Sequence, residues 1–338
     1  MCIPLPDDAA AFLTECVGDG WTARALFGDA SVRRYFRVTL PDGSTRMLAY
    51  YPVEVRPQLR TFLDAYNAVV PHGRIPEVLH YSDAAVLQSD VGDRTLFDLL
   101  HDDRSEGVRL YREAIDALVS FQRATAGSIN PPFTAEFFAN ELEMTREFYV
   151  ETLMGVPPEA SARLLPVFRR LAQNIARHPY LLCHRDYHGQ NIHIVNRSLF
   201  VIDYQDLRKG PDTYDLASLL RDRGVARILG EATEMELVDD YAALRNADPG
   251  LRRRYFETLL QRSLKILGTY SKMPIARGRM HYLEFIEPTL ESVRLAANEL
   301  GDYDELARDF PLDFSLDAAR ERVKGLLHGS TPDHAAAG

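Results

Sequence analysis

Apolar and polar residues alternate with two different periods along the chain, and the change falls near residue 90. Before it, short apolar or alternating runs are bounded by Gly, Pro, Asp and Ser, a pattern that predicts β-strands. These runs cover residues 21–28, 33–40, 46–52, 75–83 and 84–93. Helical spacing appears twice in the same part, over residues 7–18 and 57–70. Residues 1–90 are therefore predicted to form a small, mostly antiparallel β lobe with one or two helices.

From residue 91 onward the apolar residues recur mainly with the period of a helix. Helices are predicted at 94–101, 107–127, 134–155 and 158–178, and again from Thr213 to about Leu327. Pro166 lies inside one of these runs, where we expect a kink. A β-hairpin is predicted within 181–206, and the polar tail at 329–338 is predicted to be disordered. The predicted fold is α+β with two lobes, the β lobe at 1–90 and a larger, mostly helical lobe at 91–328.

The composition excludes some classes of protein. The chain has 338 residues and a mass of 38.3 kDa, and this length predicts two lobes. Its net charge is −10. Because binding to a nucleic-acid backbone needs a basic face, no nucleic-acid partner is expected. The three cysteines follow neither a disulfide nor a zinc spacing. Because no signal peptide or membrane-spanning run is recognisable, we expect a cytoplasmic protein with no membrane partner.

Ionisable side chains interrupt the strand-like runs of residues 181–206, LLCHRDYHGQNIHIVNRSLFVIDYQD. Burying such groups costs free energy unless specific partners satisfy them. Asp186 and Asn191 have the spacing H-x-D-x-x-x-x-N, and Asp203 ends the last apolar run. A hairpin that pairs IHIV with LFVI would bring Asn191 and Asp203 to the same end of two strands. Their oxygens could hold Mg²⁺, while Asp186 accepts a hydroxyl proton or orients that hydroxyl for attack on a phosphate.

The pattern matches the catalytic loop of protein kinases in part, although Asp203-Tyr204-Gln205 stands where they have D-F-G. Residues 181–223 more closely resemble the aminoglycoside-phosphotransferase-like small-molecule kinases. Three runs, GDASVRRYFRV, QSDVGDRTL and VIDYQDLRKGPDTYDLASLLRD, are most similar to the amino-sugar kinases of cell-wall recycling. Those enzymes phosphorylate the anomeric hydroxyl of N-acetylmuramate and N-acetylglucosamine. The resemblance implies a protein-kinase-like fold and transfer of a phosphoryl group from ATP to a sugar hydroxyl, with Mg²⁺ as a cofactor.

The same resemblance implies a role for individual residues. Asp186 would be the catalytic base, Asn191 and Asp203 the metal ligands, and Asp215 a carboxylate that supports the catalytic loop. The phosphates of the nucleotide would contact a turn at residues 28–31. The adenine would contact the hinge between the lobes at residues 88–91. These segments contain the expected cofactor-binding residues Gly28, Asp29, Ala30, Ser31, Gln88, Ser89 and Val91. His184, His188 and Asp206 are expected beside the site, in contact with substrate or with the residues named above.

The chain departs from most kinases in having no lysine before Lys209. Most kinases contact the nucleotide phosphates with a lysine on the third strand, where this chain has Leu48, Ala49 or Tyr50. An arginine can replace it, because a guanidinium binds phosphate through two N–H groups. The candidates on the preceding strand are Arg33, Arg34 and Arg37. Alternation puts Arg33 and Arg37 on the face shared with Tyr35, opposite Arg34, Phe36 and Val38.

Simpler interpretations stay open for several features. His184 could only fix the loop, residues 28–31 could be a plain hairpin turn, and Asp90 could cap the helix near Thr95. The acceptor could be an aminoglycoside, choline or another amine-bearing alcohol instead of a sugar. Without the lysine, the chain could also be a pseudokinase that binds nucleotide and transfers nothing. In every case we expect a small-molecule ligand and a monomer or weak dimer.

Overall fold

The computed structural model describes residues 4–26, 32–125 and 129–329. It divides into two compact units, Met1–Asn130 with Gly189–Arg208 and Pro131–His188 with Lys209–Gly338. The sequence predicted two lobes with a boundary at residue 90, where the periodicity changes. That division into lobes stays a prediction. The expected phosphate-facing turn, Gly28 to Ser31, lies outside the described residues, as does the tail from residue 330.

The first unit contains the predicted antiparallel sheet. Its strand order is β1-β2-β3-β5-β4, with β1 (Thr22–Leu26), β2 (Arg34–Thr39), β3 (Thr45–Tyr50), β4 (Val78–Tyr81) and β5 (Ala85–Ser89). The β2–β3 turn follows from its sequence, because Asp42 accepts the backbone N–H of Ser44 at 2.8 Å and Gly43 adopts φ 82°. In the register of this hairpin, Tyr35 lies opposite Ala49 and Phe36 opposite Leu48.

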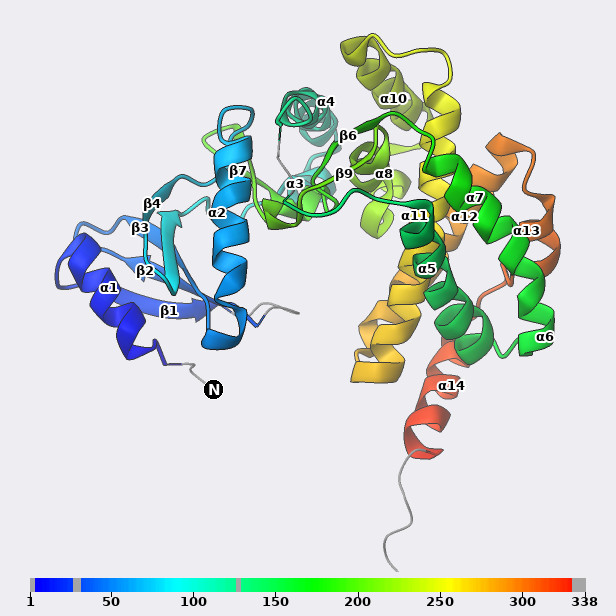
Figure 1. Cartoon of the computed structure of the whole chain (residues 1–338), viewed down its shortest axis with the longest axis horizontal. Coiled ribbons are helices and arrows are strands. Elements are labelled where there is room, and N and C mark those ends of the chain that lie inside the picture. The colour runs from blue at the N-terminus through cyan, green and yellow to red at the C-terminus, as the bar shows by residue number, and fades with distance from the viewer. Residues whose placement is uncertain (1–3, 27–31, 126–128, 330–338) are drawn as a thin grey trace, which may run out of the picture. The chain divides into compact units, whose positions relative to one another are not determined.

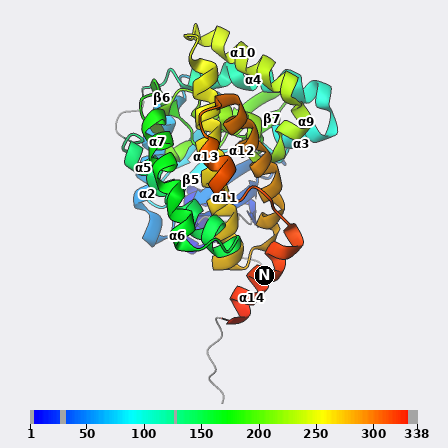
Figure 2. The same ribbon diagram turned by 90° about the vertical axis from the view of Figure 1, so that its right-hand side faces the viewer.

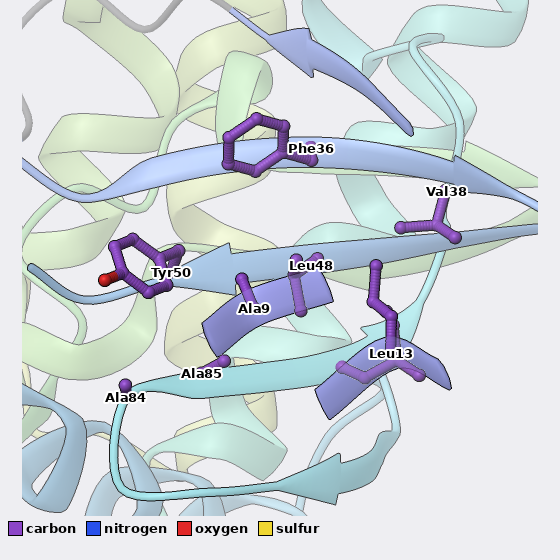
Figure 3. Packing of buried hydrophobic residues seen from close by; sticks show 9 residues of the cluster. Ala9, Leu13, Phe36, Val38, Leu48, Tyr50, Ala84 and Ala85 are labelled. Carbon is purple, nitrogen blue, oxygen red and sulfur yellow. The ribbon is translucent and has the colours of Figure 1, made fainter. Parts of the chain in front are cut away.

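One face of this sheet is covered by α1 (Asp7–Val17), and the packing is shown in Figure 3. Leu13 of α1 is completely buried with Val38 and Leu48 of the sheet. Fully burying a leucine stabilises a fold by about 2 kcal/mol, so this contact contributes to the unit's stability. Since side chains alternate along a strand, Tyr35 and Arg37 point to the opposite face.

The rest of the first unit consists of helices and a second hairpin, whose bounds are α2 (Pro57–Val69), α3 (Leu96–Asp102), α4 (Arg104–Phe121), β7 (Ile192–Val195) and β8 (Ser198–Val201). Thr95 begins α3 through a capping box with Asp98, so Asp90 is not the cap of this helix. Gly189, just before β7, packs closely against α3 and α4. A Cβ there would lie 2.8 Å from the Tyr111 hydroxyl, so glycine is needed.

The second unit is built around α11 (Leu251–Arg277), which is buried along most of its length. Figure 1 shows this helix in yellow to orange, and the helices that pack on it are α5 (Ala135–Thr145), α7 (Leu165–Ile175), α8 (Tyr214–Arg221) and α12 (Ile286–Leu300). In Figure 2, α12 lies beside α11 and also contacts α13 (Asp304–Asp309). The other elements are α6 (Pro158–Ser161), β6 (Tyr180–Cys183), β9 (Arg208–Pro211), α9 (Ala226–Leu229), α10 (Glu231–Arg245) and α14 (Leu316–Gly329).

Pro166 does not kink a helix, and that prediction was wrong. The expected helix at 158–178 is divided into α6, a short 3₁₀ turn at Ala162–Leu164 and α7, and Pro166 lies in the first turn of α7. Proline is well tolerated there, because the N–H that it lacks has no partner within the helix. Among the described helices, none is both long enough and apolar enough to cross a bilayer.

Candidate active site

One end of the β7–β8 hairpin carries the two predicted metal ligands. Ile192 of β7 pairs with Val201 of β8. Beyond this pair, the backbone N–H of Ile202 donates to the carbonyl of Asn191 at 3.0 Å. Asn191 and Asp203 therefore lie at the same end of the hairpin, as the pairing of IHIV with LFVI predicted.

Asp203 has a left-handed backbone conformation, with φ 64° and ψ 34°. This conformation costs about 1–2 kcal/mol for a residue with a Cβ, and Asp and Asn tolerate it best. The neighbouring Tyr204 is buried and stacks on Phe62 of α2, with 5.3 Å between ring centroids, which holds the turn in place. The Asp203 carboxylate is exposed, accepts a hydrogen bond from Gln205 Nε2 at 2.7 Å and lies 3.7 Å from Arg33 Nη2.

These residues fit a magnesium ion. Mg²⁺ prefers carboxylate and amide oxygens, takes few ligands from the protein, and completes its shell with water and substrate phosphates. Across the described residues, no three side chains of His, Cys, Asp or Glu gather as a metal site. Asn191 and Asp203 could thus hold an ion that shares its remaining positions with a nucleotide.

The backbone of the predicted catalytic loop is held by Asp215, in the second unit. The carboxylate of Asp215 is completely buried and accepts the N–H of His184 at 2.6 Å and of Arg185 at 2.9 Å. Burial raises the pKa of Asp215, and the charge of His184 and these hydrogen bonds oppose the rise. Arg185 has φ 81°, a strained value for a residue with a side chain. Asp215 therefore stabilises the unusual backbone that precedes Asp186.

Positive charge surrounds Asp186 within the second unit. Burial, the largest influence, raises the pKa of the Asp186 carboxyl, but Lys265 and Arg262 more than offset it, so this pKa is lower than usual. Arg262 belongs to α11, is 2% exposed, and donates from Nη1 to the carbonyl of Arg185 at 3.1 Å. Asp186 is therefore ionised at neutral pH and able to accept a hydrogen bond from a hydroxyl.

Sequence reasoning missed Arg262 and its partner Asp222. Arg262 Nη2 donates to Asp222 Oδ2 at 2.7 Å and to Ser218 Oγ at 2.9 Å, and the guanidinium lies 4.4 Å from the centre of the Tyr214 ring. Ser218 and Asp222 lie in the run VIDYQDLRKGPDTYDLASLLRD, but no motif contains Arg262. The sequence of α11 does not single out Arg262 either, because the helix contains four other arginines and none of them is buried.

The two histidines of the loop differ. His184 is completely buried and meets the ring of Tyr187 edge-on, with 5.8 Å between centroids. The backbone N–H of His188 donates to the carbonyl of Asp186 at 3.0 Å. Burial lowers the pKa of His188, so its imidazole is neutral near pH 7. No protein group in the described ranges hydrogen-bonds to Nδ1 of His188.

The predicted hinge is the end of β5 and the residues after it, in the first unit. Gln88 and Ser89 are paired within the sheet, and Val91 is buried. Asp90 is bound by Arg37, whose Nε lies 2.6 Å from Oδ2, and Asp93 accepts Arg37 Nη1 at 2.7 Å. The segment at 88–91 is thus held in position by the strand pairing and by this ion pair.

The remaining loop carboxylates have different environments. Asp206 is exposed, and within the described chain it forms no hydrogen bond or ion pair, so nothing in the structure assigns it a role. Asp212 is buried in an ion pair with Arg254, whose Nη2 lies 2.8 Å from Oδ2. Asp212 is therefore a structural carboxylate.

The chain was compared with known protein families and with individual proteins. Residues 22–256 match the model described as "Phosphotransferase enzyme family". An N-acetylmuramate/N-acetylglucosamine kinase of Neisseria meningitidis serogroup B is 29% identical over 317 residues, covering 88% of this chain and 91% of that protein. One of the same description from Pseudomonas aeruginosa is 26% identical over 297 residues, covering 84% of this chain and 87% of the relative.

Solved structures are similar in fold. A choline/ethanolamine kinase family protein from Mesorhizobium loti gives a TM-score of 0.59 at 16% identity, covering 93% of this chain and 99% of that chain. The ternary complex of streptomycin, ATP and APH(2")-IIa gives 0.56 at 14% identity, covering 78% and 91%. At these identities the likeness shows the protein-kinase-like fold alone. The family match covers well over half of the chain, and the chain therefore belongs to the phosphotransferase enzyme family.

Proposed function

We propose that this phosphotransferase transfers the γ-phosphoryl group of ATP to a sugar hydroxyl. The acceptor is the anomeric hydroxyl of N-acetylmuramate or N-acetylglucosamine, recovered in cell-wall recycling. Two relatives named N-acetylmuramate/N-acetylglucosamine kinase, which cover 84% and 88% of this chain, support these sugars as the acceptor. We place the enzyme in the cytoplasm, as a monomer or weak dimer.

Asp186 is the residue that receives the acceptor. Its carboxylate is ionised because of Lys265 and Arg262, and it orients the attacking hydroxyl towards the phosphate. An anomeric hydroxyl is more acidic than an ordinary alcohol, because the ring oxygen withdraws charge. The work asked of Asp186 is therefore mainly positioning, as expected for a loose transition state.

The nucleotide site belongs to the first unit. Asn191 and Asp203 hold Mg²⁺, which neutralises charge on the phosphates when it is bound. The backbone from Gln88 to Val91 receives the adenine, and Arg37 with Asp90 keeps this segment in place. Gly28 to Ser31 lie outside the described residues, and their contact with the phosphates stays a prediction.

The charged residues around Asp186 determine which acceptor the enzyme prefers. Lys265 is partly exposed on α11, one turn after Arg262, and its charge reaches Asp186. Arg223 also acts on the neighbouring His188 and lies 5.9 Å from the Phe285 ring. Such surroundings disfavour a cationic acceptor relative to a neutral or anionic one, with Asp222 offsetting the charge of its partner Arg262. They favour an N-acetylated sugar over an aminoglycoside or choline.

A panel of acceptors tests this function. ADP release would be followed in a coupled assay with N-acetylmuramate, N-acetylglucosamine, glucosamine, an aminoglycoside and choline, and product NMR would locate the new phosphate. We expect turnover of the two N-acetylated sugars with phosphate on the anomeric oxygen. Turnover of the aminoglycoside or choline alone would contradict the sugar assignment. Thermal stabilisation by ATP and Mg²⁺ without ADP release from any acceptor would instead indicate a pseudokinase.

A further inference from the structure

The usual phosphate-binding lysine has no counterpart on β3. Leu48 and Tyr50 belong to the cluster that packs on α1, so only Ala49 of the three points to the opposite face of the sheet. The side chain of Ala49 is a methyl group. The acidic partner that kinases place on the following helix is also missing. Within α2 the single acidic residue is Asp64, which is paired with Arg60 at 3.3 Å.

The structure separates the three arginines that could replace this lysine. Arg37 is bound by two carboxylates, with Nε 2.6 Å from Asp90 and Nη1 2.7 Å from Asp93, so it belongs to the hinge. Arg34 is exposed and alternates to the face shared with Phe36. Arg33 remains, on the face shared with Tyr35.

Arg33 is held beside the metal-binding end of the β7–β8 hairpin. Its side chain is 12% exposed, and Nη2 lies 3.7 Å from Oδ1 of Asp203. The guanidinium carbon lies 5.7 Å from the centre of the Tyr35 ring and 6.0 Å from that of Tyr51. Two aromatic rings and a carboxylate thus keep a permanent positive charge next to the residue that is to bind Mg²⁺.

We propose that Arg33 is the cation that binds the nucleotide phosphates in this enzyme, replacing the absent lysine. It does so from the segment before β2 and not from β3. In the nucleotide-free protein it lies beside Tyr51 and Asp203, and its positive charge offsets the negative charge of the Asp203 carboxylate. When nucleotide and Mg²⁺ bind, the guanidinium contacts phosphate oxygens, for which its planar pair of N–H groups is well suited. This inference rests on the proposed function, because it needs a nucleotide in the first unit.

Equilibrium binding measured by calorimetry tests the inference without relying on turnover. ATP, ADP and adenosine would be titrated, with Mg²⁺ and with EDTA, into the wild type and into Arg33→Ala, Arg33→Lys and Arg34→Ala. We expect Arg33→Ala to weaken ATP and ADP binding by about 10- to 100-fold, the loss typical of a charged hydrogen bond, and to leave adenosine binding within about twofold. Arg33→Lys should recover part of the loss. Arg34→Ala, the adjacent arginine on the other face, should match the wild type.

The other outcomes are distinguishable. If Arg33→Ala bound ATP as tightly as the wild type, or lost adenosine and ATP affinity equally, Arg33 would not be the phosphate ligand. If the alanine variant failed to fold, judged by circular dichroism, the lysine variant would decide, because its affinity for ATP but not adenosine should fall below the wild type. Absence of nucleotide binding by the wild type would overturn the proposed function, and the inference with it, before any substitution is considered.

Discussion

The carboxylate of Asp215 lies 2.9 Å from the backbone nitrogen of Arg185, thirty residues earlier in the chain, and accepts its N–H. Arg185 has φ 81°, a conformation that a residue with a Cβ does not keep without support. The other oxygen of the same carboxylate accepts the N–H of His184. The backbone conformation just before Asp186, and with it the position of the Asp186 side chain, therefore depends on the buried Asp215 carboxylate of α8.

We predict that Asp215→Ala destabilises the protein by about 2–4 kcal/mol. The change leaves two buried N–H groups without an acceptor and removes the support of Arg185. The free energy of unfolding in urea measures the loss. Asp206→Ala is the matched control, since its exposed carboxylate has no described partner and should change stability by less than about 0.5 kcal/mol. An Asp215→Ala protein as stable as this control would show that the loop does not depend on Asp215.

Asp203→Asn should lower kcat by about 100-fold or more, because the amide cannot neutralise the metal ion. Asparagine is the appropriate replacement, since it tolerates the left-handed backbone at this position. The melting temperature should stay close to that of the wild type, and chelation of Mg²⁺ should reduce the wild type to the level of the variant. Activity within a few-fold of the wild type would refute the metal assignment.

Asp186→Asn should lower kcat by about 10²- to 10⁴-fold while ATP affinity is retained. The variant keeps the size of the side chain and loses its negative charge and its ability to accept a proton. Steady-state kinetics and nucleotide titration together test this expectation. A change in KM for the acceptor with kcat unaffected would instead give Asp186 a binding role.

Lys265→Met should raise the pKa of Asp186, because a nearby positive charge favours the ionised carboxylate and its removal favours the neutral acid. The active form of Asp186 is the ionised one, so the acid limb of the kcat profile should move to higher pH. Lys272→Met, on the same helix with its ammonium near the Phe148 ring, is the control. An unchanged acid limb in Lys265→Met would mean that Lys265 does not act on Asp186.

The same variant should also separate the two proposed sugars. N-acetylmuramate carries a carboxylate and N-acetylglucosamine does not, so loss of the Lys265 charge should lower kcat/KM about tenfold more for the first sugar. The ratio of the two values, measured near pH 7.5 where Asp186 stays ionised, gives the result. An equal loss of kcat/KM for both sugars would mean that Lys265 acts on Asp186 alone and does not contact the carboxylate of the acceptor.

The pattern of apolar and polar residues was enough to predict the strands and where several site residues lie on them. The predicted pairing of the strand-like runs IHIV and LFVI placed Asn191 and Asp203 at one end of a hairpin, and the backbone hydrogen bond from Ile202 to Asn191 confirms it. Alternation also assigned Arg33 and Arg34 to opposite faces. Such assignments depend on the period of a strand or helix, which is a property of neighbouring residues.

The choice of partners for buried charges was decided only by the tertiary structure. Arg37 and Arg33 are equivalent by alternation, yet the first is paired with Asp90 and Asp93 and the second lies beside Asp203. Arg262 is paired with Asp222, forty residues earlier in the chain, and no motif contains Arg262. A buried charge needs a partner for energetic reasons, but packing between distant segments determines which one it finds.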